Sequence, residues 1–93
     1  MTVTAKANVV IYTKPMCPYC VRAMELLARK GVAYTEISAA FDDAMREEMI
    51  ARSGGGMTYP QIFIGNTHVG GCDDLVALDR AGKLDALLGL AAS

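Results

Sequence analysis

The sequence predicts an α/β fold that opens with a β-α-β unit. Residues 8–12 form a continuous, largely β-branched run, which is typical of a central strand buried on both faces. The apolar residues of 18–30 recur at helical spacing, and residues 32–37 alternate loosely, as a second strand would. Because a helix connects the two strands, they should be parallel, with a right-handed crossover.

The first helix has a recognisable signal at each end. Pro18 suits the first helical position, because its missing N–H would have no intrahelical partner there. This placement puts Cys17 at the N-cap. Gly31 should end the helix as the residue after its cap, with Lys30 in the last turn.

A second helix is expected to run to about Arg52. Either Asp42 or Asp43 can cap it, since a short acidic side chain accepts from the free N–H groups of a helix start. Glu47 and Glu48 are expected on its solvent face.

A hairpin and two further helices should complete the chain. Residues 61–64 read as a strand, Gly65-Asn66 is a two-residue hairpin signal, and residues 67–69 should return antiparallel. After the hairpin, Asp73 or Asp74 opens a third helix. A short tail helix is expected at about residues 84–90. The predicted order is β-α-β-α-β-β-α with that tail helix.

Length and composition favour one globular domain over residues 1–93. The chain is 53% hydrophobic and 20% charged, which is typical of folded rather than disordered proteins. Its formal charge is −1 and it has no basic tract, so nucleic acid is not an expected partner. No apolar run reaches the roughly 18 residues that would span a bilayer, so no membrane is expected.

The cysteine count and the N-terminus indicate where the protein should reside. Three cysteines are too few, and an odd number, for a secreted disulfide scaffold, so a reducing compartment is expected. Residues 1–6 lack the apolar core of a signal peptide, and residues 1–7 have no periodicity and should form a loose lead-in. Together these features predict a cytoplasmic protein.

Cys17-Pro18-Tyr19-Cys20 is the motif that carries chemistry. Two cysteines separated by two residues can close a disulfide, chelate a metal or exchange disulfides. At a helix N-cap, free N–H groups and the helix dipole favour an anion, so Cys17 should ionise more readily than a free thiol. Cys20 lies one helical turn further in and should be less exposed. We therefore expect Cys17 to be the nucleophile and Cys20 the resolving thiol.

A zinc site is the alternative reading of the cysteines. His68 and Cys72 could complete a Cys₃His set with the pair. The ligands of structural zinc normally come from two compact knuckles. Pro18 and the following helix instead place Cys17 at a helix N-cap, where it can act as a nucleophile. No metal is therefore expected, and His68 is interpreted as an ordinary hairpin residue.

Three motifs along the chain resemble the glutaredoxin family of the thioredoxin-fold superfamily. They span residues 12–20, which end in the Cys-Pro-Tyr-Cys of the dithiol class, residues 58–64 with Thr58-Tyr59-Pro60, and Gly70-Gly71-Cys72-Asp73-Asp74. The resemblance covers Val9 to about Leu88. It implies a thioredoxin-like fold with a four-stranded mixed sheet, whose middle strands are the first and third.

The resemblance also implies a binding site for glutathione, used as co-substrate. Its residues would be Lys14, Tyr19, Thr58, Tyr59, Pro60, Gly71, Cys72 and Asp73. On sequence alone Lys14 is equally well a solvated loop residue. The peptide bond before Pro60 would be cis, which leaves the Tyr59 backbone free to pair with an extended peptide.

Three positions in this site depart from the family pattern or stay open. Tyr59 replaces a smaller β-branched residue, so its ring either narrows the groove or stacks beside the ligand. The glycines at 54–56 stand where relatives have a basic residue for a glutathione carboxylate, and Arg52 could replace that residue. Cys72 is either a small apolar filler or a candidate for glutathionylation or a regulatory disulfide.

The activity implied by the resemblance is glutathione-dependent thiol–disulfide exchange. Cys17 alone would reduce protein–glutathione mixed disulfides, and Cys17 with Cys20 would reduce protein disulfides, ribonucleotide reductase among them. The protein should act as a monomer. Two alternatives are an iron–sulfur cluster carrier and a reductant coupled directly to thioredoxin reductase. Pro18 stiffens the loop against a cluster, and the set Lys14, Tyr19 and Asp73 favours glutathione over the second alternative.

Overall fold

The computed structural model describes residues 8–90 and has one four-stranded mixed sheet, as expected. The N-terminal lead-in predicted for residues 1–7 lies outside this range. The strands are β1 (Val9–Thr13), β2 (Thr35–Ser38), β3 (Gln61–Ile64) and β4 (Thr67–Gly70). Their spatial order is β2-β1-β3-β4, with β1 and β2 parallel and the other pairs antiparallel.

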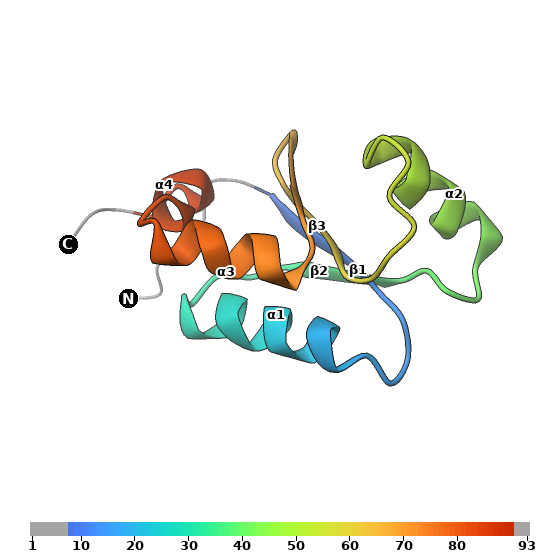
Figure 1. Ribbon diagram of the computed structural model, residues 1–93, viewed down its shortest axis with the longest axis horizontal. Helices are drawn as coiled ribbons and strands as arrows, with labels where there is room; N and C mark the ends of the chain where they lie inside the picture. Colours follow the sequence, from blue (N-terminus) through green and yellow to red (C-terminus); the bar gives the residue numbers. More distant parts are fainter. Residues whose placement is uncertain (1–7, 91–93) are drawn as a thin grey trace.

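Helices cover both faces of this sheet (Figure 1). They are α1 (Pro18–Arg29), α2 (Asp43–Arg52), α3 (Cys72–Arg80) and α4 (Leu84–Leu88). The element order matches the predicted β-α-β-α-β-β-α with a tail helix. None of the helices in residues 8–90 is both long and apolar enough to cross a membrane.

The alternation of β1 divides the core into two clusters. Val9 and Ile11 face α1, α3 and α4, where they pack with buried leucines of all three helices. Val10 and Tyr12 face the opposite side, where Met49 of α2 packs against them. The chain thus uses one fully buried strand to join two apolar layers, as a continuous β-branched run predicts.

The second strand begins at Thr35, later than the predicted residue 32. Gly31 takes a left-handed conformation with φ 73°, and its N–H donates to Ala28 O. The N–H of Val32 donates to Leu27 O, which completes a Schellman ending of α1. Val32 is buried as part of this helix cap, so its apolar character does not mark a strand.

Two further helix boundaries differ from the prediction. The third helix begins at Cys72 with Gly71 as its N-cap, so Asp73 and Asp74 lie in its first turn and do not cap it. The tail helix ends at Leu88, because Gly89 adopts φ 75° and stops it before residue 90. At α2, by contrast, Asp42 is the N-cap and accepts from Met45 N at 3.1 Å.

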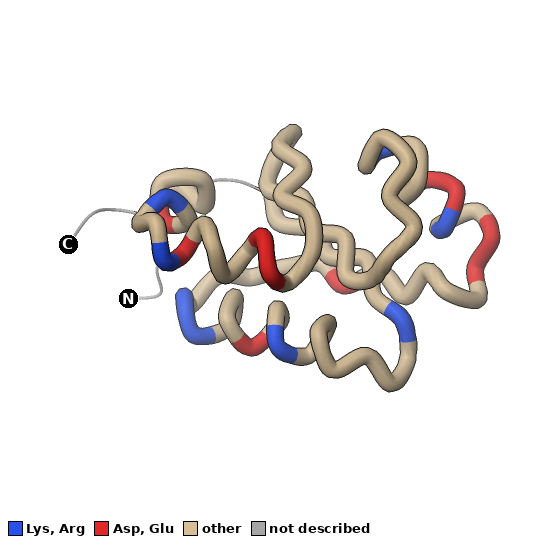
Figure 2. The backbone as a smooth tube through the Cα atoms, in the orientation of Figure 1, with Lys and Arg blue, Asp and Glu red and all other residues tan. Residues whose placement is uncertain are grey.

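Charged residues are interspersed along the helices (Figure 2). Glu48 is exposed on α2, as expected. Its carboxylate also accepts a hydrogen bond from the buried Tyr12 hydroxyl at 3.0 Å. A surface position thus satisfies a core polar group.

Candidate active site

Cys17 is the N-cap of α1, as predicted. Its backbone is extended (φ −112°, ψ 99°), Pro18 follows at the first helical position, and its Sγ accepts from Cys20 N at 3.2 Å. A sulfur that accepts a backbone N–H at a helix start is stabilised as an anion by both the hydrogen bond and the helix dipole. This geometry suits a nucleophilic thiolate.

Cys20 differs from Cys17 in both exposure and acidity. It is 1% exposed, against 5% for Cys17, which is the predicted order. Burial raises the pKa of Cys20 to about 12, and a side-chain hydrogen bond with Cys17 acts in the same direction. A backbone hydrogen bond with Lys14 and the smaller effect of its positive charge oppose this increase only in part. Cys20 therefore stays a neutral thiol near pH 7, while Cys17 has the setting of the attacking sulfur.

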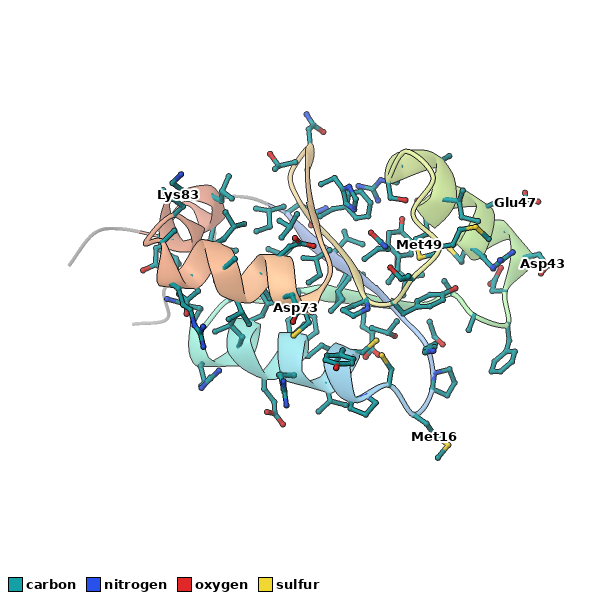
Figure 3. The ribbon with its side chains drawn as sticks, viewed as in Figure 1. Met16, Asp43, Glu47, Met49, Asp73 and Lys83 are labelled. Atoms are coloured by element: carbon teal, nitrogen blue, oxygen red, sulfur yellow. The ribbon has the colours of Figure 1, made fainter. Side chains whose placement is uncertain are left out.

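Met16 shapes the turn before the dithiol, a feature that the sequence did not reveal. Its φ is 54°, a left-handed conformation that bulky residues seldom adopt. The side chain is 98% exposed and points away from the protein (Figure 3). The turn thereby delivers Cys17 to the helix start with an apolar, solvent-exposed residue next to it.

A groove of about 220 Å³ collects most of the predicted glutathione-binding residues. We call it the cis-proline groove, because the Tyr59–Pro60 peptide bond is cis, as expected. Its lining comes from α1, from the loop before β3 and from the start of α3: Tyr19, Thr58, Tyr59, Pro60, Gly71, Cys72, Asp73 and Asp74. Seven of these eight residues were predicted from the sequence, and Asp74 is the addition.

Lys14 is the predicted residue that does not line this groove. It is exposed, and its Nζ lies 6.0 Å from the centroid of the Tyr59 ring. Its charge lowers the pKa of Cys20 against the dominant effect of burial. Lys14 thus lies near the dithiol, at the rim of the groove.

The structure shows where the Tyr59 ring lies. Its ring packs against the core cluster that contains Met49 and Phe63, on the α2 side of the sheet. The Tyr59 hydroxyl is buried without a hydrogen-bond partner in residues 8–90. The large ring is therefore directed into the core.

One backbone N–H group at the start of α3 donates a hydrogen bond within the protein. Gly71 N donates to Asp74 Oδ2 at 3.0 Å, so this N–H is not available to a ligand. The N–H groups of Cys72 and Asp73 belong to the first helical turn, which has no intrahelical acceptors. They remain suited to a carboxylate, next to the exposed carboxylate of Asp73.

Cys72 behaves as a buried filler in this setting. Burial raises its pKa, and the charges of Asp73 and Cys17 add to this effect, while Arg22 counteracts it. A buried thiol with a raised pKa is a poor nucleophile. The geometry favours the apolar interpretation of Cys72 over a regulatory thiol.

Sequence reasoning missed Gln61, which supports the cis-proline loop. Its Nε2 donates to Thr58 O at 3.0 Å and to Thr58 Oγ1 at 3.1 Å. A Cβ on Gly56 would lie 2.9 Å from that Nε2, so the last residue of the glycine run must stay small for the amide to fit. The buried polar residue directly after Pro60 is the signal that could have identified this role.

A Cys₃His zinc site would need the His68 ring close to the three cysteine sulfurs. Its ring instead stacks on Phe63 with centroids 4.9 Å apart, and its Nε2 lies 2.6 Å from Gln61 Oε1. Within residues 8–90 no three His, Cys, Asp or Glu side chains are arranged to hold a metal ion.

Arg52 does not line the cis-proline groove. Its Nη1 donates to the Tyr12 hydroxyl at 2.9 Å, and its guanidinium lies 4.5 Å from the Phe63 ring centroid. Glu48 Oε1 lies 3.8 Å from the same Nη1 atom. Its contacts are those of a residue that closes the edge of the core.

Comparison with known sequences identifies relatives over nearly the whole chain. The family model described as Glutaredoxin matches residues 9–69. A glutaredoxin from Pseudomonas aeruginosa is 62% identical over 80 residues, which cover 86% of this chain and 94% of that protein. Glutaredoxin 3 from Escherichia coli strain K12 is 60% identical over 82 residues, 88% of this chain and 98% of that protein.

Solved structures agree with these sequence matches. The solution structure of glutaredoxin from Brucella melitensis has 53% identity and a TM-score of 0.76, covering 100% of this chain and 97% of that one. The crystal structure of a buckwheat glutaredoxin–glutathione complex has 31% identity and a TM-score of 0.79, covering 94% and 84%. With a helix-capping Cys17, a buried Cys20 and a cis-proline groove beside them, the chain belongs to the glutaredoxin family of thiol–disulfide oxidoreductases.

Proposed function

We propose that this protein reduces protein–glutathione mixed disulfides through Cys17 and protein disulfides through Cys17 together with Cys20. The observation that carries the proposal is the cis-proline groove, which lies next to a cysteine held at a helix N-terminus. The related buckwheat protein was solved in complex with glutathione, which supports glutathione as the ligand of this groove.

The groove offers complementary groups for the cysteine and γ-glutamyl parts of glutathione. Its cysteine segment would pair with the Tyr59 backbone, in the manner of an added strand. The α-carboxylate of the γ-glutamyl group would accept from the N–H groups of Cys72 and Asp73, and the α-ammonium would donate to the Asp73 carboxylate. These contacts direct the glutathione sulfur toward Cys17.

The reduction of a protein–glutathione mixed disulfide takes two thiol–disulfide exchange steps. The Cys17 thiolate attacks the glutathione sulfur of the mixed disulfide, and the substrate thiol leaves and takes up a proton. A second glutathione, as its thiolate, attacks the new Cys17–glutathione disulfide, which releases oxidised glutathione and regenerates the Cys17 thiolate. In the net reaction the mixed disulfide and one free glutathione give the substrate thiol and oxidised glutathione, one half of which is the glutathione that the substrate carried. On protein disulfides, Cys20 would lose its proton and displace the substrate, leaving a Cys17–Cys20 disulfide for glutathione to reduce.

Three cysteine variants test the proposal. Turnover of a glutathionylated peptide is measured with glutathione, glutathione reductase and NADPH. Cys17→Ser should abolish turnover, and Cys20→Ser should retain much of it. Cys72→Ser is the matched control, because its thiol takes no part in either step. Loss of turnover in Cys20→Ser as well would contradict the one-thiol route.

The reductase used distinguishes the proposal from direct coupling to thioredoxin reductase. We expect the wild-type protein to turn over with glutathione and glutathione reductase, and to show no activity when thioredoxin reductase replaces both. Activity with thioredoxin reductase alone would favour the alternative reductant.

A reducing compartment, the cytoplasm, is the setting in which glutathione could act as the electron source.

A further inference from the structure

A second groove lies between α1 and α3 and continues the cis-proline groove. It has a volume of about 660 Å³, and we call it the α1–α3 groove. Its lining is Arg22 from α1 together with residues of α3 and its C-cap: Cys72, Asp73, Val76, Ala77, Arg80 and Ala81. Cys72 and Asp73 line both grooves. The two form one surface across the start of α3.

Arg22 strengthens this continuity. Its guanidinium carbon lies 5.9 Å from the ring centroid of Tyr19, a residue of the cis-proline groove. Its charge lowers the pKa of Cys72 against the effect of burial, so it acts on the thiol between the two grooves. Arg22 is therefore placed beside any chain that leaves the dithiol toward α3.

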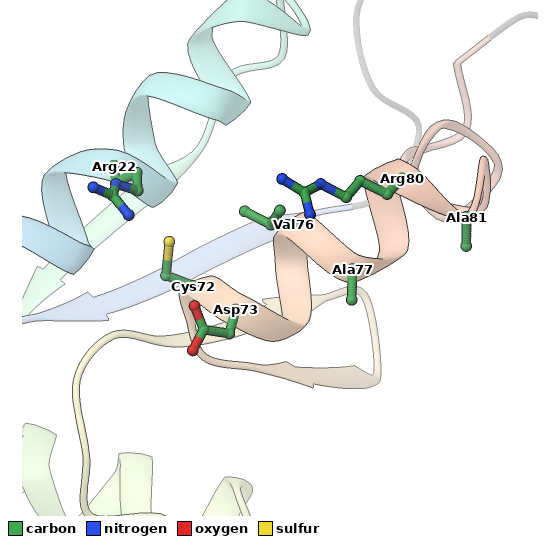
Figure 4. Close-up of a pocket in the computed structure, with 7 residues that line it drawn as sticks. All are labelled: Arg22, Cys72, Asp73, Val76, Ala77, Arg80 and Ala81. Atoms are coloured by element: carbon green, nitrogen blue, oxygen red, sulfur yellow. The ribbon is translucent and has the colours of Figure 1, made fainter.

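The α1–α3 groove has two guanidinium groups on its walls. In the part of the chain from 8 to 90, neither Arg22 nor Arg80 has a carboxylate within 4.0 Å. Figure 4 shows the Cys72 thiol pointing toward α1 and the Arg80 side chain running back along α3 over Val76. Asp73 is the one acidic residue of the lining, and its carboxylate points away from Arg80 (Figure 4). The groove thus has a surplus of positive charge over an apolar floor.

We propose that the α1–α3 groove binds an acidic segment of protein disulfide substrates, with Arg22 and Arg80 as the residues that recognise its carboxylates. The inference rests on the proposed function, because it assigns the chain that flanks the reacting cysteine of the substrate. Glutathione is a tripeptide whose γ-glutamyl end would stop at the start of α3. A protein substrate continues beyond that point, and its next residues enter the α1–α3 groove.

Helix geometry indicates how far the acidic residues should lie from the reacting cysteine. Arg22 is five residues beyond Cys17, about 7.5 Å along α1, and Arg80 is eight residues beyond Cys72, about 12 Å along α3. An extended peptide advances about 3.3 Å per residue. A carboxylate roughly two to three residues from the reacting cysteine would therefore reach Arg22, and one roughly four residues beyond the point where the substrate passes Cys72 would reach Arg80.

A matched pair of disulfide peptides tests the inference. Both have the same length and one internal disulfide, and they differ by a run of Asp or a matched run of Asn that begins two residues from each cysteine. Reduction is followed with glutathione, glutathione reductase and NADPH. Wild-type protein should favour the acidic peptide by about fivefold in kcat/KM at low ionic strength, the scale of one or two exposed ion pairs. The preference should fall toward one in 0.5 M NaCl.

Variants locate the preference in the groove. In the double variant Arg22→Gln, Arg80→Gln the ratio of the two kcat/KM values should fall to about one. Arg46→Gln removes the same charge from α2, on the other face of the sheet, and should keep the ratio of the wild type. A wild-type ratio of one, or a preference that survives in the double variant, would overturn the inference and leave the proposed function standing. Failure to reduce either peptide or a glutathionylated peptide would overturn both.

Discussion

Gln61 Oε1 accepts a hydrogen bond from His68 Nε2 at 2.6 Å, which joins β3 to β4 at the cis-proline loop. The donor and acceptor roles follow from the other end of the amide, since Gln61 Nε2 donates to the Thr58 carbonyl. The oxygen must therefore face His68, whose Nε2 must bear a proton. Gln61 is only 4% exposed, while its partners Thr58 and His68 are exposed, so the buried amide links two surface residues.

The first prediction concerns the amide nitrogen of Gln61. Gln61→Glu keeps the shape and the acceptor for His68 but replaces two donated hydrogen bonds with a carboxylate that faces the Thr58 carbonyl. We expect the free energy of unfolding to fall by about 1–3 kcal/mol. The KM for a glutathionylated peptide should rise several-fold with a smaller change in kcat, because Thr58 and Pro60 line the groove. Urea denaturation and steady-state kinetics measure the two effects.

His68→Leu is the control for this prediction. It removes the donor at the exposed end of the amide and leaves the Thr58 hydrogen bonds intact, so its effect on KM should be smaller than that of Gln61→Glu. Equal KM values for wild type and Gln61→Glu would show that the amide has no role in positioning the groove.

Much of the fold was predictable because local signals and burial agree. Pro18 at a helix start and Gly31 at its end correctly bound α1, and the alternation of β1 correctly divides the core. The strand predicted from residue 32 was wrong at its start, because Val32 is buried as part of a helix cap. Apolar character reports burial, and it does not by itself report which element the residue belongs to.

The residues of the candidate site could be predicted where they belong to short sequence motifs. Contacts between residues far apart in the sequence could not. Seven groove residues come from three short motifs, so the resemblance collected them. Asp74 was missed as a groove residue because its bond to Gly71 N depends on the exact start of α3. The Glu48 contact with Tyr12 spans 36 residues, and no local pattern encodes it.

The second prediction concerns the unpartnered hydroxyl of Tyr59. Tyr59→Phe removes a buried polar atom that has no hydrogen bond within residues 8–90, while the ring keeps its packing against Met49 and Phe63. The free energy of unfolding should rise by about 1 kcal/mol, since an unsatisfied buried group costs about 1–3 kcal/mol. Tyr59→Ala, which removes the ring, should lower it by roughly 3 kcal/mol. Thermal and urea denaturation check both signs, and a destabilised Tyr59→Phe would reveal a partner for the hydroxyl.

The third prediction separates two roles for Arg52. Its guanidinium contacts the Tyr12 hydroxyl and the Phe63 ring and lies outside the groove lining. Arg52→Met should therefore lower the free energy of unfolding by about 1–2 kcal/mol, with less than a twofold change in KM for glutathione. A large rise in that KM would instead show that Arg52 replaces the basic residue absent from the glycine run at 54–56.

The last prediction follows from the pKa of Cys20, which burial raises from 9.0 to about 12. Between these values the unfolded thiol releases its proton and the folded one keeps it, so the unfolded state binds fewer protons and stability must fall as pH rises. The contribution is fully present below pH 9 and is lost progressively toward pH 12, with a limiting slope of about 1.4 kcal/mol per pH unit. Cys20→Ser lacks this proton, so its unfolding free energy should fall less steeply. Urea denaturation of both reduced proteins at pH 8, 9 and 10 tests this, because the other titrating groups, Cys72 and Tyr12 among them, are common to both. A difference between the two proteins that stays constant from pH 8 to pH 10 would mean that Cys20 ionises as readily in the folded chain as in the unfolded one.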